Sequence, residues 1–336
     1  MDLFRSRPNR REVLATLGTA LALPGALGPQ AALAQGAYPE RPIKIIDAFA
    51  AGATTDILAR IVATRMQVTF GQPVVVEQRT GANGVVGSEF VAKAPPDGYT
   101  MFVGSTSTLA VNQALYKMSF DPTKDLAPVS MLAAQPLVVV VHPSLPIRSI
   151  PELVAYAKAN PQALNYATPG IGNPVHLATE LFKKMTGAPM THVPYARGSA
   201  AAMPDLLSGQ VQLMFAPMYF LPQVKDGRLR ALAVTGPKRM NLLPDLPTVA
   251  EAGVPGYNVT LWNAMAAPAG TPREIIAKLN AEIVRILKLP EVRAQMLATG
   301  LEPLPGTPEQ QAAFTRSEAE QWTRLIKDIG IKVEGS

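Results

Sequence analysis

The chain has 336 residues, of which 48% are hydrophobic and 17% are charged, and its formal net charge at pH 7 is +6. This length supports one large core or two smaller ones, and a modest positive charge without a like-charge run argues against a nucleic-acid partner. The lack of cysteine excludes disulfides, thiolate nucleophiles, iron–sulfur clusters and cysteine zinc sites, and three scattered histidines offer little for metal or acid–base chemistry. Composition therefore argues against an enzyme, a metal site and a bound cofactor.

Residues 1–34 are typical of an export signal. Arginines crowd the first 11 residues, an apolar stretch follows at 13–23, and Ala32-Leu33-Ala34 offers a small-x-small cleavage site. The pair Arg10-Arg11 resembles a twin-arginine signal, although a basic start also serves the general secretion route. The apolar stretch is shorter than the ~20 residues of a membrane span, which favours cleavage near Ala34 over a membrane anchor. Export without cysteine predicts a bacterial periplasm.

From residue 38 onward, short β-branched runs alternate with amphipathic stretches. Strands at 43–47, 74–78 and 100–104, separated by helices at 55–70 and 85–93, imply a parallel sheet. The continuous apolar run that comes next is typical of a strand buried on both faces. A second series then follows, with this strand at 137–142, helices at 150–159, 175–186 and 199–208, and strands at 165–167, 191–193, 211–215 and 229–234.

The composition of the sequence changes after residue 234, where prolines and glycines indicate a long irregular connection. A strand-like run at 262–268 and helical stretches at 272–287, 291–298 and 307–327 complete the chain. Two α/β series with a helical tail exceed one sheet, so we expect two lobes, with the chain crossing near 136–143 and again near 257–265. The expected boundaries are 38–138 for the first part of lobe 1, 139–258 for lobe 2 and 259–336 for the C-terminal part of lobe 1.

Two loops combine glycine, small residues and hydroxyl groups just before a helix: FAAGATTD at 49–56 and TPGIGNP at 168–174. Unpaired backbone N–H groups and the positive end of the helix dipole make such a turn attractive to an anion. Many strand-to-helix turns share these features, so the pattern also allows a purely structural role. Asp56 in the first helical turn stabilises the helix and would repel an anion, so we expect it to organise loop amides or a water.

Catalytic and nucleotide-binding patterns are missing from the sequence. The glycines at 81–87 and 170–172 do not have the GxGxxG spacing, and no phosphate-binding GxxxxGK[ST], nucleophile GxSxG or metal-binding HExxH pattern occurs. His176 and Glu180 stand four residues apart on a predicted helix without an evident third metal ligand. The sequence therefore predicts no catalytic residue and no metal site.

From residue 38 to the C-terminus the chain resembles the Bug/TctC family of periplasmic solute receptors for tripartite tricarboxylate transporters. The segments that carry the resemblance are YPERPI (38–43), TDILAR (55–60), PDGYT (96–100), NYATPGIG (165–172), HVPY (192–195), DLLSGQV (205–211), LRALAV (229–234), LPTVAEAG (246–253) and APAGTP (267–272). They occur in order along almost the whole mature chain.

The resemblance implies an α/β fold of the type II periplasmic binding protein class, with two Rossmann-like lobes that close like a Venus flytrap over a ligand cleft. The ligands that the resemblance implies are mono- and dicarboxylates, including tricarboxylic acids, acidic amino acids and aromatic acids. The family's ligand loops fall on the two loops described above, and the family adds the strand end at 104–106 and the turn at 195–199. The ligand-binding residues implied are Phe49, Ala53, Thr54, Asp56, Ser105, Thr106, Thr168, Gly170, Ile171, Gly172, Tyr195, Gly198 and Ser199.

The chain departs from the family pattern at two places. The first loop of the family reads aromatic-x-Pro-Gly-Gly-x-x-Asp, whereas here Ala51 replaces the proline and Ala53 the second glycine. A Cβ at Ala53 would oppose any positive φ and any close approach of the backbone to a ligand, so we expect a reshaped pocket. The family commonly has an aspartate after Val211, where Gln212 removes a charge that we expect near the cleft side of the second lobe.

These observations predict a monomeric, non-enzymatic receptor that delivers a small carboxylate to a membrane permease. One alternative is a receptor whose ligand-bound form docks on a signalling partner, and the sequence does not separate the two because both would use the same closed surface. Another alternative is a periplasmic hydrolase or lyase on the same scaffold. A positioned base and nucleophile would indicate the enzyme, and the sequence offers neither.

Overall fold

The structure of the protein is a computed structural model that describes residues 38–195 and 198–332, so the expected export signal at 1–34 lies outside the described residues. From Pro39 onward the described chain forms one compact unit with two β-sheets. The strands are β1 (Ile43–Asp47), β2 (Val74–Gln78), β3 (Thr100–Ser105), β4 (Leu126–Pro136), β5 (Val138–Val141), β6 (Asn165–Thr168), β7 (Thr191–Pro194), β8 (Leu213–Ala216), β9 (Arg230–Val234), β10 (Thr260–Pro268) and β11 (Glu302–Pro303). The α-helices are α1 (Thr54–Phe70), α2 (Val85–Ala92), α3 (Ile150–Ala159), α4 (Pro174–Thr186), α5 (Met203–Ser208), α6 (Leu221–Lys225), α7 (Arg273–Lys288), α8 (Pro290–Ala298) and α9 (Pro308–Ile329).

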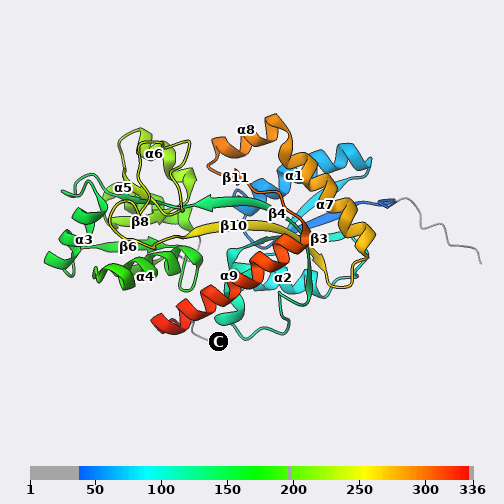
Figure 1. Ribbon diagram of the computed structural model, residues 1–336, viewed down its shortest axis with the longest axis horizontal. Coiled ribbons are helices and arrows are strands. Elements are labelled where there is room, and N and C mark those ends of the chain that lie inside the picture. The colour runs from blue at the N-terminus through cyan, green and yellow to red at the C-terminus, as the bar shows by residue number, and fades with distance from the viewer. Residues whose placement is uncertain (1–37, 196–197, 333–336) are drawn as a thin grey trace, which may run out of the picture. The chain divides into compact units, whose positions relative to one another are not determined.

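The first sheet has the strand order β11-β4-β10-β3-β1-β2. β1, β2 and β3 run parallel, which confirms the prediction from the alternating strands and helices. β10 lies antiparallel between β3 and β4, so β4 runs in the same direction as β1 to β3. Ile43, Ile45 and Ile46 of β1 are all 0% exposed, which accounts for the isoleucine-rich sequence of this strand. α1 covers this part of the sheet and packs against α7 (Figure 1).

The second sheet has the strand order β7-β6-β8-β5-β9. β6 runs parallel to β7 and β8, whereas β5 is antiparallel to both of its neighbours, β8 and β9. All four valines of β5 are buried, which confirms the expectation of a strand covered on both faces. The buried side chains of both sheets, from Phe102 on β3 to Phe215 on β8, belong to one continuous hydrophobic cluster.

The two sheets are connected at the edges where their parallel strands end. β1 to β4 all end at one edge of the first sheet, and β6 to β9 all end at one edge of the second. β4 reaches its edge at Pro136 and β5 leaves the other edge at Val138, so Leu137 alone separates the two edges along the chain. Thr235, just after β9, stabilises this connection between β4 and β5 with two hydrogen bonds. Its hydroxyl accepts the Leu137 N–H at 2.8 Å and donates to the carbonyl oxygen of Val259 at 2.7 Å. Connectivity therefore places the two carboxyl edges next to each other.

Several predicted elements need correction. The strand β4, the short helix α6 and the two-residue strand β11 were not expected. The helix expected over 199–208 is divided into a 3-10 turn, η4 (Ser199–Ala202), and α5, because Pro204 has no N–H to bond the preceding turn. The strand expected at 211–215 begins at Leu213. The lobe boundaries at 138 and 258 stay a prediction. Within the described chain, no helix has both the length and the apolar character that a membrane span needs.

Helix α9, red in Figure 1, packs along β4 and the turn η2 (Ser107–Val111) that follows β3. Both tryptophans of the protein meet at this helix. The indole N–H groups of Trp262 on β10 and Trp322 on α9 donate to Oε2 of Glu318 at 2.8 and 3.1 Å. The backbone N–H of Trp262 also donates to the Thr106 hydroxyl at 2.9 Å, so the tryptophan cluster reaches the end of β3.

Candidate functional site

The first predicted loop is a tight turn between β1 and α1. Gly52 has φ +83°, a conformation that strains any residue with a side chain. Its N–H donates to Oδ2 of Asp56 at 2.9 Å. Ala53 is extended, and α1 begins at Thr54 without a hydrogen bond from a capping side chain. Asp56 therefore organises a loop amide, as expected from its place in the sequence.

Asp56 is a compensated charge. Its Oδ1 accepts a hydrogen bond from Nε2 of Gln78 at 2.8 Å and pairs with Nε of Arg60 at 2.9 Å. Burial acts to raise the pKa of this carboxyl, but the hydrogen bonds from Arg60 and the Gly52 N–H outweigh burial and hold the pKa below its usual value. Asp56 is thus an ionised side chain whose oxygens are occupied by protein donors.

The second predicted loop, between β6 and α4, has the same construction. Gly172 has φ +74°, and its N–H donates to Nδ1 of His176 at 3.1 Å. Asn173 is extended, and its side chain accepts the N–H of Val175 at 3.0 Å, which caps α4. Because Nδ1 of His176 accepts this bond, the neutral ring carries its proton on Nε2.

His176 belongs to a stack of three rings below the second loop. Its ring centroid lies 4.1 Å from that of His192, which lies 5.1 Å from that of Tyr166. Burial and the neighbouring His192 lower the pKa of His176 to about 4, against the opposite effect of Glu180. Burial also lowers the pKa of His192, whose Nε2 lies 2.6 Å from the hydroxyl of Thr168. Two neutral imidazoles therefore support the beginning and the end of this loop.

The ends of β1 and β6 repeat one another as well. The last residue of each strand accepts the N–H of the residue two positions later: Oδ1 of Asp47 from Phe49 at 3.1 Å, and the hydroxyl of Thr168 from Gly170 at 3.2 Å. The carbonyl oxygen of each strand end also accepts an N–H from the loop after the neighbouring parallel strand. Each sheet thus carries the same strand–turn–helix unit at its carboxyl edge.

The remaining predicted residues of the first sheet lie around this unit. Thr54 and Phe49 are half-buried. Ser105 ends β3, and its Oγ is buried with no hydrogen-bond partner among the residues that the structure describes. The Thr106 hydroxyl is occupied, because it donates to the Trp262 carbonyl oxygen at 3.3 Å and accepts the Trp262 N–H. Ser105 is therefore better placed than Thr106 to offer a hydroxyl to a ligand.

The remaining predicted residues of the second sheet form a matching group. Ile171 is 45% exposed at the tip of the loop. The N–H of Tyr195 donates to the Thr168 carbonyl oxygen at 2.8 Å, which holds Tyr195 beside the loop, and its hydroxyl donates to Asp205 at 2.6 Å. Gly198 has φ +96°, and Ser199 is buried. The thirteen predicted residues thus fall into two groups, one at each carboxyl edge. Their joint contact with one ligand stays a prediction.

The structure bears on two expectations about departures from the family pattern. Ala53 has φ −67°, so its Cβ meets no positive φ at this position, and the left-handed residue of the turn is Gly52. A reshaped pocket at Ala53 stays a prediction. Gln212 does not lie on the cleft side. It directly precedes β8, and its Oε1 accepts the N–H of Asn165, the first residue of β6, at 3.0 Å. It therefore stands at the amino edge of the sheet, opposite the edge that carries the predicted loops.

Sequence reasoning missed the parts played by Asp47, His176 and His192. His176 was considered only as a partner of Glu180, whose Oε1 lies 3.9 Å from its Nε2. One signal was available for both loops: a polar side chain occupies the third residue of each helix, four positions after a glycine. A second missed feature is the turn at 81–84, where Ala82 and Asn83 both have positive φ.

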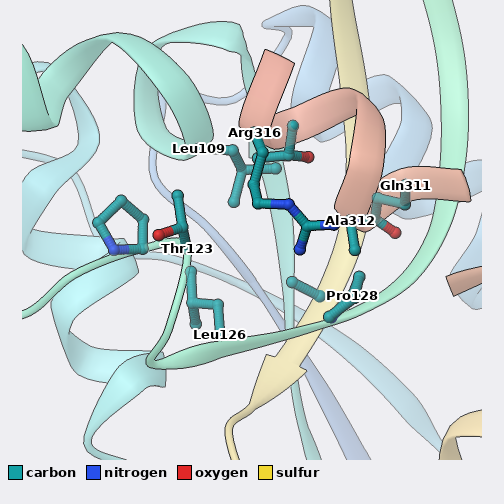
Figure 2. A pocket seen from close by; sticks show the side chains of 10 residues that line it. Leu109, Thr123, Leu126, Pro128, Gln311, Ala312 and Arg316 are labelled. Carbon is teal, nitrogen blue, oxygen red and sulfur yellow. The ribbon is translucent and has the colours of Figure 1, made fainter. Parts of the chain in front are cut away.

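Figure 2 shows a cavity in the first sheet, away from these loops, between α9, η2 and the 122–128 segment. Its volume is about 30 Å³, which suits a water molecule rather than a dicarboxylate. Oε1 of Gln311 and Oγ1 of Thr315 line it without a protein partner in the described chain, and the Arg316 side chain reaches across it. Among residues 38–195 and 198–332, no group of three or more His, Cys, Asp or Glu side chains is arranged to hold a metal ion.

The fold and the paired loops define a class of protein: a two-lobe α/β solute-binding protein of type II, each lobe built on its own sheet. The family model of the tripartite tricarboxylate transporter family receptor, TctC, matches residues 58–331. The chain belongs to this family, which confirms the resemblance seen in the sequence. Receptors of this kind bind solutes.

Individual relatives agree with this assignment. The chain is 38% identical to the BugT protein of Bordetella pertussis over 329 residues, which cover 97% of this chain and 100% of BugT. It is similar to the structure of R. palustris Rpa4515 with adipate, with 38% identity and a TM-score of 0.82 over 88% of this chain and 99% of the other. It is also similar to MatC from Rhodopseudomonas palustris with bound malate, with 32% identity and a TM-score of 0.77 over 86% and 100% of the two chains.

Proposed function

We propose that this protein is a periplasmic solute receptor that binds a small mono- or dicarboxylate between the carboxyl edges of its two sheets and delivers it to a tripartite tricarboxylate-type permease. The observation that carries the proposal is the repeated unit, in which each sheet presents a glycine-containing turn at the start of a helix. Backbone N–H groups and the helix dipole favour an anion there. Two such turns at neighbouring edges suit a ligand with a carboxylate group, gripped from both sides.

The electrostatics of the loops support recognition by backbone groups. Asp56 is already compensated by Arg60 and Gln78, so it adds little repulsion toward an anion. Ser105, with a buried hydroxyl that bonds no described residue, can donate to a carboxylate at the end of β3. Adipate and malate in the two similar structures are the first ligands to test.

The wider role follows from the same proposal. Residues 1–34 export the chain, by the twin-arginine route, to the periplasm, where it works as a monomer without cofactor or catalysis. Export through that route depends on the arginine pair, so the double variant R10K/R11K is expected to stay in the cytoplasm. Cell fractionation measures this, and unchanged export would point to the general secretion route.

A thermal-shift screen of carboxylates against the full chain tests the ligand class. Adipate, malate, acidic amino acids and aromatic acids form the panel, with 1,6-hexanediol and 1,6-diaminohexane as neutral and cationic controls of adipate length. A ligand at a hundredfold over its Kd adds about 2.7 kcal/mol to the free energy of unfolding, which raises Tm by several degrees. Stabilisation by a carboxylate but by neither control is expected. A shift with the diol or the diamine, or no shift with any acid, contradicts the proposal.

A matched pair of glycine variants tests the place of binding. Gly170 and Gly227 both have positive φ, and a Cβ added at either one meets no atom within 4 Å. Gly170 lies at the carboxyl edge of the second sheet, whereas Gly227 precedes β9 at the amino edge. G170V is expected to weaken binding of the best carboxylate by about tenfold or more by blocking approach to the turn, and G227V to leave it unchanged. Equal affinities of the two variants would move the site away from this loop.

A further inference from the structure

Asp47 is a buried carboxyl group at the base of the first loop, and the proposed function gives it no task beyond holding the turn. The residue is 0% exposed. Its Oδ1 accepts the Phe49 N–H, whereas its Oδ2 is buried and has no hydrogen-bond partner in the part of the chain that the structure describes. A buried carboxylate oxygen without a donor is costly, and protonation removes the charge and turns the oxygen into a donor.

The two carboxyl groups of this loop are treated differently by their surroundings. Asp56 receives Arg60, Gln78 and the Gly52 N–H. Asp47 receives one backbone donor, the Phe49 N–H, and faces the Thr55 hydroxyl, whereas the cation of the adjacent helix, Arg60, is paired with Asp56. In the second loop the equivalent position is Thr168, which carries no charge. Asp47 is therefore the uncompensated charge of the pair of loops.

The groups around Asp47 come from α1 and from the segment after β2. On α1, Asp56 acts to raise its pKa, while Arg60 and the facing Thr55 hydroxyl lower it. After β2, Arg79 donates its backbone N–H to the Asp47 carbonyl oxygen at 2.7 Å, but its guanidinium pairs with Glu77. Burial is the largest influence and, with Asp56, raises the pKa of Asp47 to about 6. This carboxyl is thus ionised at neutral pH, yet close to taking up a proton.

We propose that the binding of a carboxylate ligand to the first loop is coupled to the uptake of one proton by Asp47, which makes Asp47 a residue that sets the affinity of the site. The inference rests on the proposed function. A carboxylate held by N–H groups at the start of α1 adds a second negative charge beside Asp47, and two like charges in a shared low-dielectric site disfavour ionisation of both. The proton comes from the buffer, binds Oδ2 and leaves the ligand ionised.

Isothermal titration calorimetry of the full chain with adipate at pH 7 measures this proton directly. Titrations in phosphate and in Tris differ by the heat of buffer ionisation times the number of protons taken up. Adipate itself is fully ionised at pH 7, because an ordinary carboxyl has a pKa of about 4.3. We expect close to one proton per adipate in the wild-type protein and none in D47N. The wild-type affinity should rise by up to about tenfold for each pH unit between pH 8 and pH 6, and D47N should show no such rise.

Two variants identify the group that takes up the proton. D97N removes a surface carboxyl that pairs with Arg41, and it should keep the full uptake. H176Q removes the buried ring of the second loop. Uptake that persists in D47N but disappears in H176Q would assign the proton to the histidine and overturn the proposal, as would zero uptake in the wild-type protein.

A measurement without ligand separates this proposal from the proposed function. Carbon-13 NMR of the Asp47 side-chain carboxyl should show a titration near pH 6 in the unliganded protein and a higher midpoint with adipate. A titration near pH 4 overturns the proposal even if adipate binds. If neither adipate nor malate binds, the proposed function fails for these acids and the coupling fails with it, whereas a midpoint near pH 6 would still establish the charge of Asp47.

Discussion

The turn before α1 and the turn before α4 have one backbone geometry but are held by different chemistry. Carboxyl groups of Asp47 and Asp56 hold the first turn, whereas the hydroxyl of Thr168 and the imidazole of His176 hold the second. Only the acceptor function is common to the four side chains. A strand–turn–helix unit of this kind therefore fixes the positions of the hydrogen-bond acceptors but not their charge. Because a buried carboxyl group and a buried imidazole hold the two turns, the contributions of the two loops to stability change with pH in opposite directions.

The largest expected effect is on stability in acid. His176 has a pKa of about 4 when folded against 6.5 as an ordinary histidine, so below pH 6.5 the unfolded chain binds a proton that the folded chain rejects. Stability is then lost as the pH falls to 4, by on the order of 3 kcal/mol. Asp47 has a raised pKa of about 6 against 3.8, so the folded chain binds the extra proton. Stability is gained as the pH falls through 6, by a similar amount on the order of 3 kcal/mol.

Single variants separate these opposing contributions. On going from pH 7 to pH 4, D47N should lose about 3 kcal/mol more than the wild-type protein, and H176Q should lose about 3 kcal/mol less. Urea unfolding at the two pH values measures both differences. Identical pH profiles for the three proteins would show that the two loops do not differ in charge as the structure indicates.

A smaller effect is expected from removing the acceptor of the second turn. H176L keeps an apolar side chain of similar bulk but leaves the Gly172 N–H unpaired, which should cost about 2 kcal/mol at pH 7. H176Q supplies an amide oxygen that can reach the same N–H and should recover about half of that loss. Denaturant unfolding compares the two variants. Equal stability of H176L and H176Q would show that the ring acts through packing alone.

The smallest effect concerns the N-terminal caps of the two helices, because α4 has a capping side chain and α1 has none. N173A removes the side chain that caps α4 and should cost about 1 kcal/mol, while A53N adds such a cap to α1 and should gain up to about 1 kcal/mol. Thermal unfolding of both variants gives the comparison. Loss of stability in A53N would mean that the first turn does not tolerate the capping geometry of the second.

Much of the fold could be predicted from local patterns. The isoleucines of β1 and the valines of β5 indicate buried strands by themselves. β4 could not be predicted, because its sequence contains prolines and a serine and its strand character comes from pairing with β10, more than 120 residues away in the chain. β8 was placed two residues early, and Gln212, which precedes it, lies at the amino edge of the sheet and not on the expected cleft side.

The candidate site likewise has residues whose role local sequence predicts and residues whose role it does not predict. Asp56 could be predicted as an organiser of loop amides, since a carboxylate in the first turn of a helix faces the N–H groups of the preceding loop. Asp47 and His176 could not, because their properties come from burial and from ring neighbours that tertiary packing brings together. Gly52, and not Ala53, has the positive φ of the first turn, and local sequence does not show which of the two positions needs it.

The two indoles that share Glu318 provide an intrinsic fluorescence probe of the protein. Trp262 and Trp322 are the only tryptophans of the chain, so their emission arises from a single spot where β10, α9 and the end of β3 meet. A carboxyl group shared by both indole N–H groups makes their emission wavelength sensitive to small displacements of that spot. A change in fluorescence on addition of a solute would thus report movement at the end of β3, without any label and at micromolar protein concentration.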